Sequence, residues 1–394
     1  MIDQYTLPND ALRRSIALDR IYKIIALGDI VVLLALLVLL LELGGWRWLR
    51  DRTERLPPRL RGLAFFTAFV TVLCLEPLPF GVWAHRVSLS YGLSVQGWPS
   101  WWGDRAKSLG LALAFAVPLL VGARWLVRRT GKRAWLWISA VAVPVVVAVT
   151  FASPYVVAPL FDEFEPLAAH HEALVRKLAV VIGRSGEAIP PSRMFLMKAS
   201  AKHTSINAYV TGFGASKRVV VWDTTADRRP DDEVLFIFGH ELGHYVLGHI
   251  VRGVLVASLS ICVSLFVGQL LVARLLQRRR YALTGLDDPA AFGLYAVVFT
   301  VLGLLGEPAG NALSRRQERA ADVYGQEIIH GFVPDPAQTA ARTFQALGEL
   351  DLDLPDPSPW WVWWSYGHPS ISERVRFAAQ YDPWQHGSPR YFAR

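Results

Sequence analysis

Cysteine is scarce in this sequence of 394 residues, which contains only Cys74 and Cys262. Both cysteines fall inside long apolar segments, so the chain has neither a disulfide framework nor a cysteine-based metal site. Charged residues are also scarce, since Asp, Glu, Lys and Arg make up 19% of the chain while hydrophobic residues make up 53%. This composition excludes an ordinary soluble enzyme.

The sequence also lacks an internal repeat and a nucleic-acid-binding motif. A missing repeat argues against a transporter built from two related halves. The net charge is +8, but Lys and Arg gather in short loops beside apolar segments, where membrane topology and anionic headgroups explain them. We therefore expect a lipid bilayer as a partner and no nucleic acid.

Long apolar runs are abundant, and six of them reach the ~20 residues that cross a bilayer. They comprise residues 24–43, 63–83, 109–127, 134–156, 255–276 and 290–305. The first run is too long for a cleavable signal peptide, and no cleavage site follows it. The sequence thus predicts a multi-pass integral membrane protein. We divide it into four N-terminal spans (1–152), a polar region (153–252), two spans (253–308) and a C-terminal region (309–394).

The most specific motif is His240-Glu241-Leu242-Gly243-His244. Residues four apart on a helix share a face, so both imidazoles can reach one metal ion. Glu241 can then reach a water molecule on that ion rather than the ion itself. The alternative is a helix with two surface histidines. The apolar segment 233–238 before the motif argues against it, because buried ionisable groups need a partner.

A catalytic metal site needs a third protein ligand. His249 lies five residues after His244, which on a continuous helix rotates it ~140° away, and we interpret it as a non-ligand near the membrane surface. Glu318 is the better candidate. It is four residues before Asp322 on an expected helix, so one carboxylate can bind the metal while the other holds a ligand histidine. The alternative is an exposed salt-bridge face, because arginines are adjacent.

An even number of spans places both termini and the 153–252 region on one side of the membrane. His240, His244 and Glu318 can therefore meet without crossing the bilayer. His244 lies some ten residues before the span near residue 255, and Glu318 follows the last span closely. A site tied to the interface in this way suits a substrate that is itself membrane-bound or lipid-attached.

The motifs together resemble the integral-membrane zinc metalloproteases that include the type I CAAX prenyl endopeptidases and the HtpX-like proteases. The likeness extends over nearly the whole chain. Its elements are Ser205 to Tyr209, Lys217 to Thr224, the segment 239–244, Asn311 to Asp322, and His368-Pro369-Ser370 with Glu373-Arg374. Residues 91–94 resemble a loop of the CAAX branch specifically.

This resemblance implies a multi-span α-helical membrane protein with a membrane-proximal α+β region of the gluzincin type. One Zn²⁺ per chain would be held by His240, His244 and Glu318. Glu241 would be the general base, and Asp322 would support a ligand histidine. The implied activity is that of a zinc metalloendopeptidase that cleaves a peptide or protein substrate, membrane-bound or lipid-modified.

Further residues would contact the substrate. Asn207, Ala208 and Tyr209 would lie on an edge strand that pairs with the substrate backbone, although Asn207 alone is also typical of a turn. His368 or Arg374 would stabilise the oxyanion by donating a hydrogen bond. For Arg374 the alternative is a surface ion pair with a nearby carboxylate.

Two questions stay open at this point. The CAAX proteases resemble seven-span proteins and this chain has six spans, which leaves open whether a closed intramembrane chamber forms. The Arg-rich loops at 47–61, 124–133 and 274–280 lie opposite the catalytic segments, so charge bias places the site outside the cytoplasm. The resemblance places the site inside the cytoplasm.

The rival functions are HtpX-like quality control of membrane proteins and a non-catalytic scaffold or transporter with a vestigial site.

Overall fold

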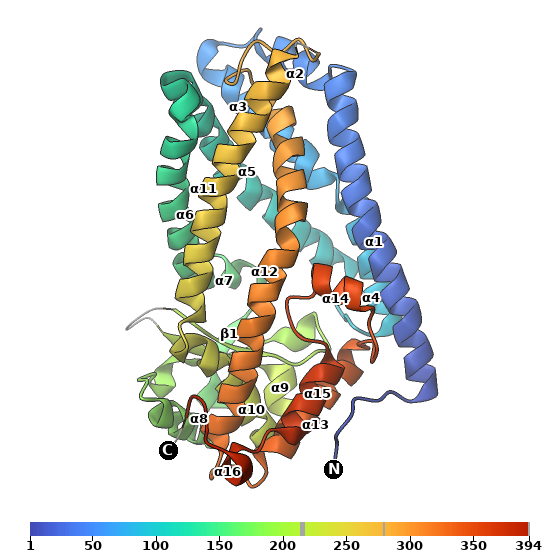
Figure 1. Ribbon diagram of the computed structural model, residues 1–394, viewed down its shortest axis with the longest axis vertical. Helices are drawn as coiled ribbons and strands as arrows, with labels where there is room; N and C mark the ends of the chain where they lie inside the picture. The colour runs from blue at the N-terminus through green and yellow to red at the C-terminus, as the bar shows by residue number, and fades with distance from the viewer. Residues whose placement is uncertain (213–216, 279, 393–394) are drawn as a thin grey trace.

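The computed structural model describes residues 1–212, 217–278 and 280–392. The molecule is elongated, with a bundle of long helices and a smaller mixed α and β region at one end (Figure 1). Both chain termini lie at the end that carries the mixed region. This arrangement agrees with an even number of spans.

Long apolar helices form the bundle because their backbone groups are satisfied internally, as a bilayer requires. They are α1 (Asn9–Glu42), α3 (Pro58–Leu75), α4 (Leu78–Tyr91), α5 (Trp98–Thr130), α6 (Ala134–Val156), α11 (His249–Gln277) and α12 (Ala291–Ile329), with the short α2 (Gly45–Thr53) at the far end. Aromatic side chains from α2, α3 and α12, among them Trp46, Phe66 and Phe292, form the buried centre of this bundle.

The expected spans are present. Five helical stretches of the described chain are long and apolar enough to cross a membrane, and one of them, Trp98–Val156, contains both α5 and α6, which pack against each other. The predicted span 63–83 lies within the stretch Pro58–Tyr91, whose helix is interrupted at Pro77 between α3 and α4, because proline lacks the amide donor that would continue α3. The predicted span 290–305 lies at the start of α12, which continues as a helix to Ile329.

The mixed region contains a four-stranded sheet in the order β1-β2-β4-β3, with β1 at Phe164–Pro166, β2 at Met194–Met197, β3 at Ala208–Thr211 and β4 at Arg218–Trp222. Strands β2 and β4 are parallel and the other pairs are antiparallel. Strand β3 therefore lies at an edge. Helices complete the region: α7 (Ala158–Phe161), α8 (Glu172–Ser185), α9 (Asp223–Arg228), α10 (Asp231–Val246), α13 (Pro336–Asp351), α14 (Pro359–Ser365), α15 (Ile371–Gln380) and α16 (Pro383–His386).

Helices α10 and α12 approach each other closely because glycines face the contact. A Cβ atom added at Gly325 would lie 3.0 Å from the backbone nitrogen of His240, and one at Gly239 would lie 2.7 Å from Ile328 Cγ2. Gly243 packs in the same way against Tyr324. The pair is therefore held at a distance that only glycine allows, and His240 faces the last part of α12.

We expect Gly325→Ala to destabilise the protein by about 1–3 kcal/mol, because the added methyl meets rigid backbone of α10. The measurement is the thermal unfolding midpoint in detergent. Gly310→Ala on the same helix is the matched control, since nothing lies within 4 Å of its new methyl group. Equal midpoints for the two variants would show that the close approach does not limit stability.

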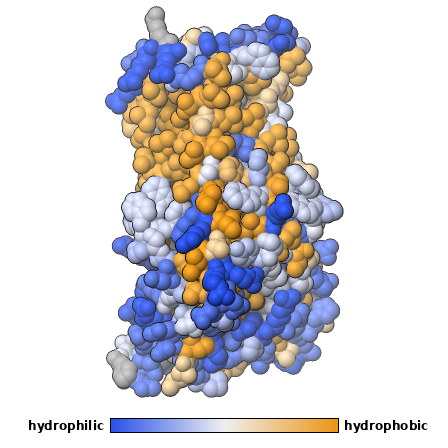
Figure 2. Space-filling model, turned by 90° about the vertical axis from the view of Figure 1, so that its right-hand side faces the viewer, coloured by the Kyte–Doolittle hydropathy of each residue, from blue (hydrophilic) through white to orange (hydrophobic). Residues whose placement is uncertain are grey.

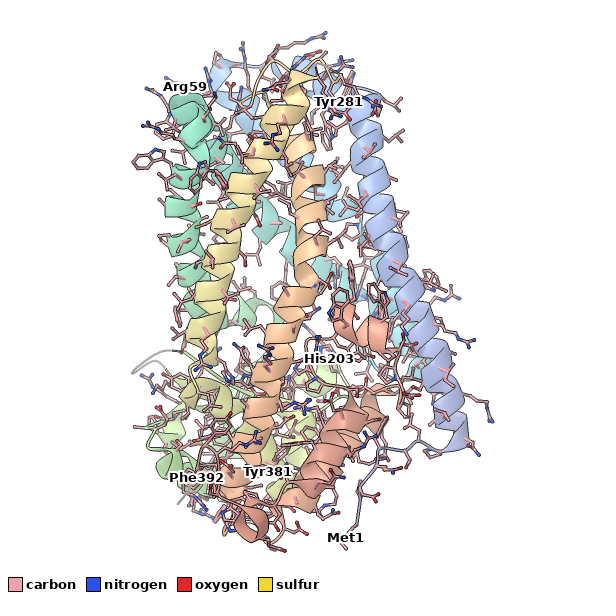
Figure 3. All side chains as sticks on the ribbon, viewed as in Figure 1. Met1, Arg59, His203, Tyr281, Tyr381 and Phe392 are labelled. Atoms are coloured by element: carbon pink, nitrogen blue, oxygen red, sulfur yellow. The ribbon has the colours of Figure 1, made fainter. Side chains whose placement is uncertain are left out.

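The surface shows where the bilayer lies. In Figure 2 a broad apolar band covers the bundle, and hydrophilic residues cover both ends. Side chains such as Leu255 and Leu259 on α11 are more than half exposed, as expected for lipid-facing positions. Figure 3 places Arg59 and Tyr281 at one end of the molecule and Met1, Tyr381 and Phe392 at the other. The Arg-rich loops are thus separated from the mixed region by the apolar band.

Candidate metal centre and active-site cleft

Three predicted ligands converge on one point. His240 and His244 come from successive turns of α10, and Glu318 comes from α12. The Nε2 atoms of the two histidines are 3.1 Å apart. Glu318 Oε2 lies 3.3 Å from His240 Nε2, and Oε1 lies 3.4 Å from His244 Nε2. One donor atom from each residue falls within 4.8 Å of the others, which is the donor set of a metal ion.

The second nitrogen of His240 faces a carboxylate. Its Nδ1 atom lies 2.8 Å from Asp322 Oδ1, and Arg374 holds the same carboxylate through two hydrogen bonds of 3.0 and 2.6 Å from Nε and Nη2. Burial lowers the pKa of His240, but the contacts with Asp322 and Glu318 more than offset this and raise it to about 10. This chain of contacts fixes the imidazole with Nε2 directed at the other ligands.

The expectation that His249 points away from the site is wrong. Its Nδ1 atom lies 3.0 Å from Nδ1 of His244, and the side chain is buried. The rotation argument assumed one continuous helix, but α10 ends at Val246 and α11 begins at His249, with Gly248 between them at a φ of 70°. The left-handed glycine turns the chain back toward the metal site. Each ligand histidine therefore has a partner at its Nδ1 atom.

We expect His249→Ala to weaken metal binding by about 10- to 100-fold, the usual cost of losing a partner that orients a ligand. The measurement is the metal dissociation constant from competition with a chelator. His249→Asn, which retains a hydrogen-bonding atom, should recover part of the affinity. An unchanged constant in the alanine variant would mean that His244 needs no support.

Glu241 lies beside the ligands without joining them. Its Oε1 atom is 3.9 Å from His240 Nε2, and the side chain lines the adjacent cavity. Burial raises the pKa of this carboxyl group to about 7. A carboxylate in this position can exchange a proton with water next to a bound metal ion.

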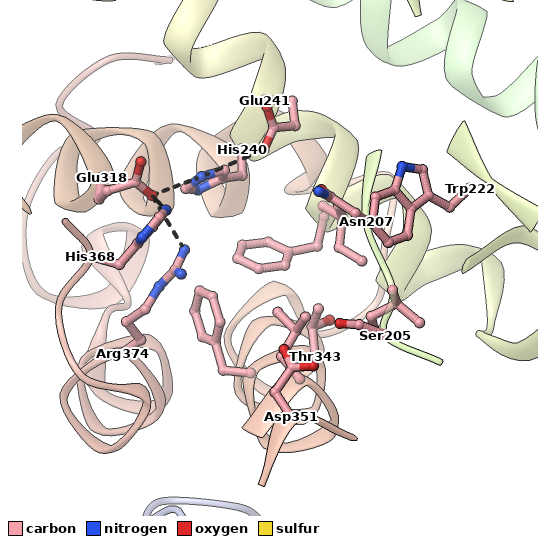
Figure 4. A pocket seen from close by; sticks show the side chains of 15 residues that line it. Ser205, Asn207, Trp222, His240, Glu241, Glu318, Thr343, Asp351, His368 and Arg374 are labelled. Carbon is pink, nitrogen blue, oxygen red and sulfur yellow. Dashed lines mark ion pairs between the residues drawn. The ribbon is translucent and has the colours of Figure 1, made fainter. Parts of the chain in front are cut away.

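A cavity of about 250 Å³ leads away from the ligands (Figure 4). Its walls come from the segment before β3, from α10, from α13 and from the C-terminal elements, and include Asn207, Phe236, Phe344, His368 and Arg374. Asn207 is exposed and directly precedes the edge strand β3, where Ala208 is buried and Tyr209 is half-buried. The chain thus enters the sheet edge from the wall of the cleft, at Asn207.

His368 and Arg374 occupy different positions in this cleft. His368 Nε2 is 3.4 Å from Glu318 Oε2, and its side chain is 63% exposed. Arg374 is almost fully covered and is paired with Asp322, so the surface ion pair considered from the sequence is wrong. Its neighbour Glu373 pairs with Arg319 instead. His368 is therefore free to meet a substrate, whereas Arg374 positions Asp322.

Several cleft residues were missed from the sequence. Trp222, Thr343, Leu347 and Asp351 line the cavity but belong to no metal-binding or catalytic pattern. Thr343, Leu347 and Asp351 lie on α13, so their positions depend on how α13 packs against α10 and α15, whereas Trp222 is the last residue of β4. For His249 there was a signal, since the glycine before it is typical of a helix end.

The family profiles that match this chain are those of membrane peptidases. Residues 168–382 match the profile of peptidase family M48. Residues 18–163 match a profile described as CAAX prenyl protease N-terminal, five membrane helices. The two matches meet at the start of the mixed region and contain every residue of the metal centre.

Individual proteins show the same likeness. An uncharacterized metalloprotease of Bacillus subtilis (strain 168), YhfN, is 34% identical over 319 residues, which cover 80% of this chain and 72% of the relative. A CAAX prenyl protease 1 homolog of Oryza sativa subsp. japonica is 26% identical over 323 residues, with coverage of 80% and 72%. The crystal structure of S. mikatae Ste24p shares the fold, with a TM-score of 0.83 at 21% identity, covering 95% of this chain and 90% of that one.

Proposed function

This chain belongs to peptidase family M48, and from that premise we propose that it is a zinc endopeptidase that cleaves prenylated peptides beside the bilayer. That it is a multi-pass membrane metalloprotease follows from the family and from its apolar helices. The proposal adds the identity of the metal, the roles of the site residues and the class of substrate.

The convergence of His240, His244 and Glu318 is the observation that supports zinc. Zinc prefers two imidazole nitrogens and a carboxylate oxygen, with a fourth position left open in catalytic sites. Ligand atoms at ~2.05 Å from a tetrahedral ion lie ~3.3 Å from one another. The two imidazole nitrogens are 3.1 Å apart, and each lies within 3.4 Å of one of the two oxygens of Glu318, so the donor atoms are close enough to share such an ion.

A zinc ion bound there would polarise the scissile carbonyl and a water molecule. Glu241 then takes a proton from the water molecule while the oxygen of that water forms a bond to the carbonyl carbon. The same proton passes to the amine nitrogen when the peptide C–N bond breaks, which restores the carboxylate. His368 donates a hydrogen bond to the oxygen that becomes negative. The edge strand that begins after Asn207 holds the substrate extended, through backbone pairing.

Two observations support a lipid-modified substrate. The ligand helices α10 and α12 connect directly with the bilayer, one through α11 and the other as a span itself. The N-terminal spans match the profile of CAAX prenyl proteases, and several relatives carry that name. A prenyl chain could remain among the apolar helices while its peptide enters the cleft.

The test uses purified protein in detergent and one quenched fluorescent peptide in two forms, with a farnesylated and with a free cysteine. We expect cleavage that a chelator abolishes and Zn²⁺ restores, with kcat/KM at least tenfold higher for the farnesylated form. Equal rates for both forms would overturn the prenyl preference and leave a general membrane peptidase. Cleavage that persists in chelator would contradict the zinc mechanism.

A further inference from the structure

The end of the cleft remote from the metal carries a negative charge that the proposed reaction does not use. Asp351, Ser205 and Thr343 lie there, away from His240, Glu241 and Glu318 (Figure 4). Burial raises the pKa of the Asp351 carboxyl group, and the neighbouring Ser205 side chain offsets part of this rise. Among the described residues, no Lys or Arg forms an ion pair with Asp351. The carboxylate is therefore partly buried without a counter-ion.

The end of a helix adds to this negative charge. Asp351 is the last residue of α13, so the unpaired carbonyl groups of that helix end lie beside it. Asp353 follows two residues later, but burial together with Asp351 raises its pKa to about 7, so Asp353 is only partly ionised at neutral pH. Arg374, the nearest cation on the cleft wall, is already bound to Asp322 by two hydrogen bonds. The potential at this end therefore favours a cation.

The walls beside Asp351 are apolar. Ile206 and Phe344 are buried, and Leu347 lies half-buried one turn before Asp351 on the same helix. A lysine or arginine side chain has this combination of properties, an aliphatic stem and a charged end. Burial of its stem against these residues would bring the cation to the carboxylate.

From this placement we infer that Ser205, Leu347 and Asp351 form a subsite for a basic side chain of the substrate, lysine or arginine. The inference rests on the proposed peptidase function and names the residue type that the cleft selects. A buried carboxylate without a partner is costly, and a substrate cation supplies that partner. An acidic substrate side chain would be rejected for the same reason.

The test is a set of quenched peptides that differ at one position at a time, with Lys, its neutral isostere norleucine, or Glu. At the peptide position that occupies the subsite, wild-type protein should prefer Lys to norleucine by about 10- to 100-fold in kcat/KM. This is the size expected for a charge-assisted contact in a partly buried site. Asp351→Asn should remove the preference, so that the Lys and norleucine peptides are cleaved with equal kcat/KM. Asp351→Lys should reverse the preference, so that the peptide with Glu is cleaved faster than the peptide with Lys.

Glu349→Gln is the control, because Glu349 is exposed on the same helix and loses the same charge outside the cleft. Its Lys preference should match wild type. Peptide binding to a Glu241→Gln variant, followed by fluorescence anisotropy, gives a second measurement that does not need cleavage. Binding without any Lys preference would overturn the subsite even if the protein is a peptidase. Selective binding without cleavage in wild type would instead contradict the proposed function alone.

Discussion

Replacing Glu241 by Gln should abolish peptide cleavage while the protein keeps its metal. The amide has the size of the carboxylate but cannot accept the proton of the attacking water. General-base catalysis contributes about 10²- to 10⁴-fold, so we expect a loss of at least that size. Glu241 is not among the three converging donor residues, which is why the metal content should not change.

The measurement combines the cleavage rate with the metal content of the same purified sample. Glu172→Gln is a suitable control, because this side chain is exposed on α8, outside the cleft, and pairs with Arg176 one turn later. The control should keep both activity and metal. A Glu241→Gln protein that cleaves at a tenth of the wild-type rate or faster would remove Glu241 from the role of base.

Replacing Glu318 by Gln should have the second large effect, on the metal itself. The substitution removes the only anionic donor of the three, and the neutral amide oxygen is a poorer zinc ligand. We expect the metal dissociation constant to rise by more than ~100-fold. This is a larger loss than that expected when a residue that only orients a ligand is removed. Cleavage should fall with it, and should return in part at high Zn²⁺ concentration.

Metal content after dialysis and chelator competition measure this effect. Arg316→Gln is the control on the same helix, because Arg316 is exposed two residues before Glu318. It should bind metal as the wild type does. If Glu318→Gln retained full metal affinity, the third ligand would have to be another group, and His368, 3.4 Å from Glu318, would be the first to examine.

The sequence predicted the centre of the site well because its geometry is local. Two histidines four residues apart converge whenever they lie on a helix, and Glu318 and Asp322 follow the same rule on α12. That α10 and α12 would pack together was suggested by the resemblance. The sequence alone did not reveal that Gly239, Gly243 and Gly325 make their close approach possible.

The failures came from places where a helix begins or ends. His249 was misplaced because the helix was extended through Gly248, although that residue adopts a left-handed conformation. The interruption of the helix at Pro77 within the span 63–83, and the continuation of α12 beyond residue 305, were not visible in the hydrophobic pattern either. A hydrophobic run predicts which residues lie in the lipid, but it does not predict where a helix ends. A helix that leaves the bilayer keeps its backbone hydrogen bonds although its residues become polar.

The continuity of α12 also determines what can be separated from the membrane. One helix of 39 residues, roughly 58 Å long, begins in the apolar bundle and ends beyond Glu318 and Asp322. The segment that matches the peptidase family, residues 168–382, includes α11 as well. No cut in the chain can therefore release the catalytic part into water with its helices intact. Any change in how deeply α12 sits in the lipid shifts the Glu318 carboxylate by the same distance.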